Sequence, residues 1–125
     1  MAAKEISKYL PLTEATYYIL LALVEPLHGY GVMQKVEALS GGDVNIGPGT
    51  LYGAFTNLLK EDLITMVKEE ERRKSYALTE KGRRLLAKQV RRLEIMSRNG
   101  QAILVQLSNA TQDQTRTSSY KERSK

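Results

Sequence analysis

Apolar residues recur along the first half of the chain in a pattern that predicts three helices. The segment 14–24 is apolar almost all round, which predicts a helix at the centre of the fold. Thr13 can cap its first turn, and Pro26 disfavours helical angles in the residue before it. A second helix is expected over 30–40 and a third from Pro48. The first eleven residues are mixed in character and predict no regular element.

The third predicted helix has two contrasting faces. Its Pro48 suits a first helical position, because the N–H group there is unpaired in any helix. Apolar side chains at helical spacing form a stripe that can be buried, and they are Leu51, Ala54, Phe55 and Leu58. The opposite face carries small or hydrogen-bonding residues, namely Tyr52, Gly53, Thr56, Asn57 and Lys60. We therefore expect one side in the core and the other free for a partner.

The second half of the chain predicts a hairpin and one long helix. Residues 63–68 and 75–78 have strand character, and a polar tip over 69–74 separates them. Thr79 can then cap a helix of roughly 29 residues, about 43 Å long at 1.5 Å per residue. The rest of the chain is too small to cover such a helix, so much of its apolar seam would be exposed in a monomer. That seam consists of Leu86, Val90, Leu93, Met96, Ile103 and Leu107.

Composition excludes several classes of chemistry. The chain has 125 residues, enough for one domain, and 42% of them are hydrophobic. It has no cysteine and only one histidine, His28, which excludes disulfides, thiolate nucleophiles and zinc sites built from cysteine or several histidines. It also lacks a Ser/His/Asp set and a glycine loop with P-loop spacing. We expect no enzyme, no cofactor and no metal site.

Nothing in the sequence predicts a membrane protein. The most apolar stretch covers residues 17–24, far shorter than the ~20 residues of a spanning helix. The first residues lack the apolar core of a signal peptide. We expect a soluble cytoplasmic protein.

Positive charge is concentrated between residues 72 and 92. The whole chain has a net charge of +5, but this window alone carries nine cations and a single acid, Glu80. Such a concentration is typical of a protein that binds a polyanion, although a solvated helix face has the same composition. The cations are Arg72, Arg73, Lys74, Lys81, Arg83, Arg84, Lys88, Arg91 and Arg92.

The order of the predicted elements indicates a winged helix-turn-helix domain. Three helices bury a shared core, the third keeps a polar face free, and the hairpin forms a wing beside it. The major groove of DNA, about 12 Å wide, admits one such helix. We therefore predict a mainly α fold of the α+β class that binds double-stranded DNA.

Three sequence blocks resemble the PadR-type transcriptional regulators, and the likeness covers about residues 12–107. The blocks are the apolar run 19–24 with His28-Gly29-Tyr30-Gly31, then Ile46-Gly47-Pro48-Gly49-Thr50-Leu51-Tyr52, then residues 72–82. The chain departs from the family at Gly47, where a serine-like residue is usual, and at Gly53, where proline is frequent. The resemblance implies a homodimeric repressor that binds a near-palindromic operator and is released by a small molecule.

The resemblance and the residue types together suggest which side chains contact DNA. Candidates on the third helix can approach base edges, whereas the arginines of the wing suit phosphates or a narrow minor groove. Tyr18 is included because family members often use the matching tyrosine near the DNA backbone. The full set is Tyr18, Pro48, Gly49, Thr50, Tyr52, Gly53, Thr56, Asn57, Arg72, Arg73 and Lys74.

The resemblance makes the long last helix a dimerisation arm. We expect the DNA-binding domain over 1–82, the dimerisation helix over 83–107 and a disordered polar tail over 108–125. The seam between two copies is either dry and packed or holds a cavity for a small apolar effector, lined by Leu86, Val90, Leu93 and Met96.

Two other interpretations of the same pattern stay open. A MarR-like regulator shares the winged fold, but it usually has a further dimerisation helix for which this chain has little room. A winged helix can also serve as an adaptor that docks an acidic protein on its basic surface. The sequence does not distinguish a repressor from an activator, nor does it identify the operator.

Overall fold

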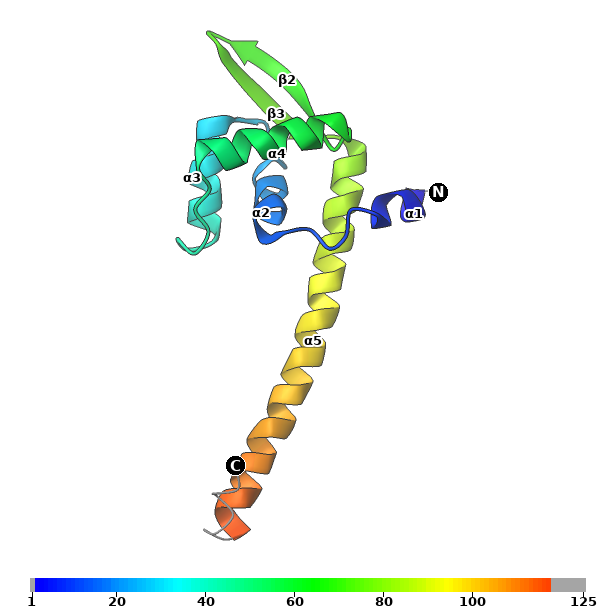
Figure 1. The fold of residues 1–125 in the computed structure, drawn as a ribbon, viewed down its shortest axis with the longest axis vertical. Coiled ribbons are helices and arrows are strands. Elements are labelled where there is room, and N and C mark those ends of the chain that lie inside the picture. The colour runs from blue at the N-terminus through cyan, green and yellow to red at the C-terminus, as the bar shows by residue number, and fades with distance from the viewer. Residues whose placement is uncertain (1, 118–125) are drawn as a thin grey trace. The chain divides into compact units, whose positions relative to one another are not determined.

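The protein folds into five helices and three strands over the part of the chain that the structure describes. A computed structural model describes residues 2–117 (Figure 1). The chain divides into a first unit, Met1–Gln89, and a second unit, Val90–Lys125. The elements are α1 (Ala2–Ser7), α2 (Glu14–Ala22), β1 (Leu27–His28), α3 (Gly29–Leu39), α4 (Pro48–Lys60), β2 (Ile64–Glu70), β3 (Arg73–Leu78) and α5 (Glu80–Thr117).

Side-chain caps set the beginnings of two helices, as the sequence predicts. The Thr13 hydroxyl accepts a hydrogen bond from the Thr16 amide at 3.1 Å, which satisfies a free donor in the first turn of α2. The Thr79 hydroxyl accepts one from the Gly82 amide at 3.0 Å at the start of α5. The same hydroxyl donates to the Asp62 carbonyl at 2.7 Å, so this cap also ties α5 to the end of α4.

The sheet has the order β1-β3-β2, and all its pairs are antiparallel. β2 and β3 form the predicted hairpin, which extends beyond the helices in Figure 1. β1 is a two-residue strand that pairs Leu27 with Tyr76 and His28 with Ser75. The sequence predicted only a turn there, since two residues are too few to show an alternating pattern.

The core of the first unit combines side chains from the three central helices, the sheet and the start of α5. The fully buried side chains include Ile19 and Leu20 of α2, Val36 of α3 and Leu51 of α4. At about 25 cal/mol per Å² of buried apolar surface, these residues dominate the stabilisation of the fold. The predicted winged-helix architecture of the α+β class is confirmed.

The last helix continues further than the sequence predicted. α5 extends to Thr117, whereas the sequence predicts an apolar seam that ends at residue 107 and a disordered tail over 108–125. Once a helix exists, each further residue gains one hydrogen bond without repeating the cost of nucleation, so polar residues can extend a helix that apolar residues began. Residues 118–125 lie outside the described residues. Over residues 2–117, no helix has both the length and the apolar character needed to cross a membrane.

Candidate nucleic-acid interface

One face of α4 is exposed, and glycines leave part of the helix backbone on that face without side chains. Pro48 occupies the start of the helix, and no side chain caps it at Gly47. Gly49 and Gly53 both lie on the exposed face, and a Cβ atom added to either would meet no other atom within 4 Å. Internal packing therefore does not require a glycine at either position. The remaining predicted contact residues of α4, all exposed, are Thr50, Tyr52, Thr56 and Asn57.

A row of three aromatic rings links α4 to the wing. The ring of Phe55, on the buried face of α4, lies 5.8 Å from the Tyr52 ring in an edge-on arrangement and 4.7 Å from the Tyr76 ring of β3. The Tyr52 hydroxyl lies against Gly29 at the start of α3, where a Cβ atom would collide with it. Since half of the Tyr52 side chain stays exposed, this residue both positions α4 and presents a polar aromatic surface.

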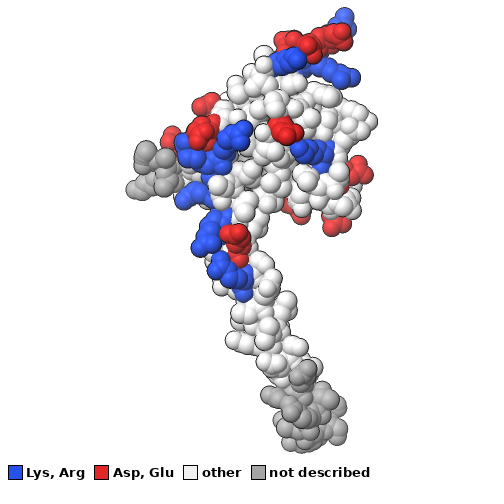
Figure 2. All heavy atoms as spheres, turned by 180° about the vertical axis from the view of Figure 1, so that it is seen from behind, with Lys and Arg blue, Asp and Glu red and all other residues white. Residues whose placement is uncertain are grey.

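The predicted cations of the wing lie at its tip, but acidic residues oppose two of them. Arg72, Arg73 and Lys74 are all exposed. An irregularity between Met66 and Lys68 shifts the strand register, so that Glu70 faces Arg73 and Glu69 faces Lys74. Figure 2 shows basic and acidic side chains mixed at this tip. The wing is thus much less positive than its cations alone suggest.

The turn of the wing has an unusual backbone. Glu71 and Arg72 have φ angles of 47° and 72°, in the left-handed region that favours glycine and asparagine. Strain of this kind in a non-glycine residue is frequent at functional sites.

A hollow of about 300 Å³ joins the wing to α4 and the start of α3, and we refer to it as the wing hollow. It brings Tyr52 together with the three predicted cations of the wing. Its lining contains no acidic side chain, and sequence reasoning missed the contribution of four of its members. These are His28, Gly29, Tyr30 and Tyr76, of which the first three belong to the first block that resembles the PadR family. The full lining is His28, Gly29, Tyr30, Tyr52, Arg72, Arg73, Lys74 and Tyr76.

Seven of the eleven predicted contact residues do not line the wing hollow, and Asn57 and Tyr18 are two of them. Asn57 lines a separate crevice on the other flank of α4, together with residues from the segment before α2. Tyr18 is half-buried on α2, where its ring contacts that of Tyr17 edge-on at 5.5 Å. The structure therefore does not bring these two residues together with the cations of the wing.

The comparison with protein families decides the identity of the fold. The family model of PadR-like transcriptional regulators matches residues 19–88, which include α3, α4 and both strands of the wing. The chain belongs to this family. The resemblance seen in the sequence is thereby confirmed, and the family is one of transcriptional regulators rather than of enzymes.

Individual relatives support the assignment to the PadR-like family. The chain is 35% identical over 85 residues to a 37.1 kDa protein in transposon TN4556 of Streptomyces fradiae, and the match covers 67% of this chain. It is 33% identical over 69 residues, 55% of its length, to the transcriptional regulator YqjI of Escherichia coli K12. The matches span only 24% and 33% of these two relatives. Among solved structures, a PadR-like transcription factor from Bacteroides fragilis superposes with a TM-score of 0.61 at 28% identity, over 71% of this chain and 88% of the other.

The predicted seam of this PadR-like chain is divided between the two units. Leu86 is buried in the first unit, whereas Val90 and Leu93 are half-buried. The seam residues further along α5 are exposed, and so are three neighbouring apolar side chains. The exposed set is Ile95, Met96, Ile103, Leu104, Val105 and Leu107.

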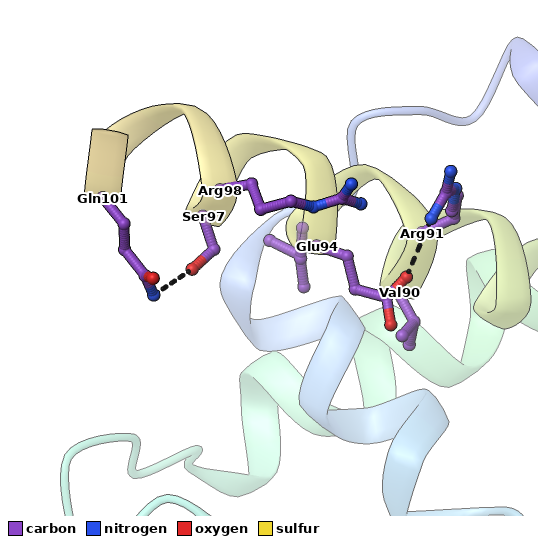
Figure 3. Close-up of a pocket in the computed structure, with 7 residues that line it drawn as sticks. Val90, Arg91, Glu94, Ser97, Arg98 and Gln101 are labelled. Atoms are coloured by element: carbon purple, nitrogen blue, oxygen red, sulfur yellow. Dashed lines mark hydrogen bonds and ion pairs between the residues drawn. The ribbon is translucent and has the colours of Figure 1, made fainter. Parts of the chain in front are cut away.

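Charge changes abruptly along α5 in the second unit. Figure 2 shows blue side chains on the early turns of α5 and none beyond them on the described part. In sequence, no charged residue occurs between Arg98 and Asp113. A hollow on the charged part is lined by seven residues of this helix, and its internal contacts are Arg91 to Glu94 at 3.4 Å and Gln101 to Ser97 at 3.2 Å (Figure 3). Of the predicted effector-site residues, it contains Val90 and Leu93.

The described residues offer no alternative metal chemistry. Among them, no three histidine, aspartate or glutamate side chains come together as a metal site would require. His28 lies in the wing hollow beside tyrosines and cations, where it can act as a hydrogen-bonding group.

Proposed function

We propose that this chain is a sequence-specific regulator, most simply a homodimeric repressor, that binds a near-palindromic operator in double-stranded DNA. The observation that carries the proposal is the open face of α4 beside the wing hollow. A helix with bare backbone and small polar side chains can approach base edges closely. Cations next to it neutralise phosphates and fix the helix in register.

Phosphate contacts supply most of the affinity in this proposal. If each complex involves about 6–10 phosphates, binding weakens ~10³–10⁵-fold between 50 and 200 mM salt. The family to which the chain belongs consists of transcriptional regulators, which is consistent with a DNA partner. An adaptor that docks an acidic protein would show no specific complex with duplex DNA.

A second copy of the chain is the partner that we propose for α5. The second unit exposes Met96, Ile103 and Leu107 on a stretch of α5 that has no charged residue between Arg98 and Asp113. Apolar residues at such spacing bury their surface efficiently against the same seam of another helix. Two copies of α4 then enter successive major grooves about 34 Å apart. The domain organisation is part of this proposal, with DNA binding over 1–82 and dimerisation over 83–107.

Release by a small apolar effector completes the proposal. Val90 and Leu93 are half-buried and Met96 is exposed, so these residues can line a space between two copies of α5. The chain has no tryptophan for stacking a planar drug, and position 93 is leucine. An aliphatic or compact effector therefore suits this seam better than an extended planar one.

The first experiment selects bound sequences from a random pool of DNA duplexes. We expect two related half-sites separated by about one helical turn. Arg73→Ala should weaken binding to all duplexes, whereas Arg92→Ala removes the same charge from α5, outside the wing, and should weaken it less. Equal losses for the two variants would mean that only the overall charge matters, and recovery of no enriched sequence would refute specific recognition.

The second experiment tests the dimer directly. Ile103→Glu places a charge in the proposed seam and should produce monomers in sedimentation experiments at micromolar concentration. Val105→Glu is the matched control, because Val105 is similarly exposed but lies on a different side of α5. A wild-type protein that sediments as a monomer would refute the proposed assembly.

A further inference from the structure

A second recess lies on the flank of α4 away from the wing hollow, and we refer to it as the strap crevice. Its floor consists of Ala54, Asn57, Leu58 and Glu61, which follow one another at helical spacing on α4. Its roof is the segment 9–13, the strap, and Thr16 and Leu63 complete it. The volume is about 240 Å³. All of these residues belong to the first unit.

Contacts at both ends hold the strap in place without a ligand. The Tyr9 hydroxyl donates a hydrogen bond to the Glu61 carboxylate at 2.7 Å. The Leu12 amide donates one to the side-chain oxygen of Gln89 at 3.1 Å, and Gln89 is 5% exposed. Thr13 then caps α2. Because the crevice is preformed, a ligand would lose little free energy in ordering its walls.

The walls of the strap crevice define the chemistry of its occupant. Pro11, Leu12, Ala54, Leu58 and Leu63 provide apolar surface for a compact hydrophobic body. Sites for drug-sized ligands measure roughly 300–1,000 Å³, so this crevice suits a smaller molecule with on the order of ten heavy atoms.

The polar group on the floor favours a neutral hydrogen-bond donor. The Tyr9 hydroxyl holds the pKa of Glu61 below its ordinary value, and Lys8, Lys81 and Lys60 lower it further. Glu61 is therefore an ionised acceptor at neutral pH. The same three lysines oppose a cationic ligand, so an uncharged N–H or O–H group is the better match.

We infer that the strap crevice is a binding site for a small neutral molecule with a compact apolar body and one hydrogen-bond donor. Ligand binding in the crevice does not depend on the proposed function, whereas the expected effect of the ligand on DNA binding rests on it. Asn57 of α4 lines the crevice and is also a predicted base contact, so a ligand in the crevice competes with DNA for this side chain.

Indole is a suitable probe, because it combines an apolar bicycle with a single N–H donor. Titration into the ¹⁵N-labelled full chain should give saturable shifts of backbone amides in the strap and in the second half of α4. The matched probe 1-methylindole lacks the donor and should bind about tenfold more weakly, as expected for a lost hydrogen bond to a charged acceptor.

Two variants locate the site. Ala54→Leu fills the crevice from its floor and should abolish the shifts, whereas Ala87→Leu makes the same change at an exposed position of α5 and should preserve them. If Ala54→Leu does not fold, Thr16→Leu fills the crevice from α2. Shifts that survive a folded crevice-filling variant, shifts confined to the second unit, or no saturable shifts would each overturn the inference.

The consequence for DNA is measured separately, with a duplex from the selection experiment. Saturating indole should lower the affinity of the wild-type chain for DNA severalfold and leave that of Ala54→Leu unchanged. A chain that binds indole in the crevice but never binds DNA would refute the proposed function and leave the site intact. A chain that binds DNA but shows no indole shifts would refute the binding site in the crevice and leave the proposed function intact.

Discussion

Gly53 provides the sharpest test of how α4 meets its partner. It lies within a helix of 13 residues, where glycine is less favourable than alanine by about 1 kcal/mol because of its greater backbone freedom in the unfolded chain. A Cβ atom at this position meets nothing within 4 Å, so no contact inside the protein requires its absence. The free chain would therefore be more stable with alanine at this position.

Gly53→Ala should accordingly raise stability and lower DNA affinity at the same time. We expect the free energy of unfolding to rise by about 0.5–1 kcal/mol, or a few degrees in Tm for a unit of this size. If base edges approach the bare backbone, the new methyl group intrudes into a packed contact. Such intrusions cost about 1–3 kcal/mol, which is about 5- to 150-fold in Kd.

Thermal melts and fluorescence anisotropy with the selected duplex measure both effects. A scrambled duplex is the control, since phosphate contacts dominate binding to it and should change little. A more stable variant that binds the selected duplex as tightly as wild type would refute the close approach of α4 to DNA. An equal loss of affinity for both duplexes would mean that the methyl group does not act through the recognition of bases.

Three further changes test other parts of the first unit. Replacing Glu71 with Asn and Arg72 with Gly places residues that tolerate left-handed angles at both positions, and chemical denaturation should show a gain of about 1 kcal/mol in stability. The same double variant should bind DNA more weakly, because it loses the Arg72 cation. Glu71→Asn alone should keep the affinity for DNA. Gly82→Ala forces a Cβ atom into the backbone carbonyl that precedes β2, and melts should show a loss of about 1–3 kcal/mol. Tyr9→Phe removes the hydrogen bond that lowers the pKa of Glu61, so NMR titration should show this pKa rising towards its ordinary value. In the wild type, the lowered pKa of Glu61 stabilises the folded state at pH values above that pKa, and this stabilisation is lost as the pH falls through it. The variant lacks this contribution, so its free energy of unfolding should decrease less on acidification.

Local signals were sufficient to predict most of the fold. Thr13 and Thr79 each cap a helix through contacts within three residues, and such signals are visible in any single sequence. The buried stripe of α4 was also predicted correctly, because the helical period alone places Leu51, Phe55 and Leu58 on one side. The hairpin followed from two short runs of strand character and a polar tip.

The strap was not predictable, because distant residues hold it in place. Tyr9 meets Glu61 across 52 positions and Leu12 meets Gln89 across 77, and neither pair leaves a pattern in the sequence. The helix α1 before it is only six residues long, shorter than an isolated helix can be in water. Ile6 is buried, which indicates why this segment packs against the rest of the first unit.

The same limitation affects the predicted contact residues of α4. The sequence assigned Tyr52 and Asn57 to one polar face, but that face is wide, and its two flanks border different recesses. Which flank lies towards the wing depends on the stacking of Phe55 on Tyr76, a contact across 21 positions of the chain. A helical period establishes that residues are exposed, but not which neighbour they share.

The distribution of charge on the wing depends on a single irregularity in the pairing of β2 with β3. With uninterrupted pairing from Met66, Lys68 would have faced Lys74, and like charges in that position would repel. The irregularity between Met66 and Lys68 instead sets Glu69 opposite Lys74 and Glu70 opposite Arg73. The negative charge opposite these two cations weakens their attraction for a phosphate, although the Glu70 carboxylate itself pairs with Lys68 at 3.3 Å, whereas Arg72 lies in the turn and has no cross-strand partner in this register. If the wing binds DNA as proposed, Arg72→Ala should therefore lower the affinity more than Arg73→Ala or Lys74→Ala, as measured by fluorescence anisotropy.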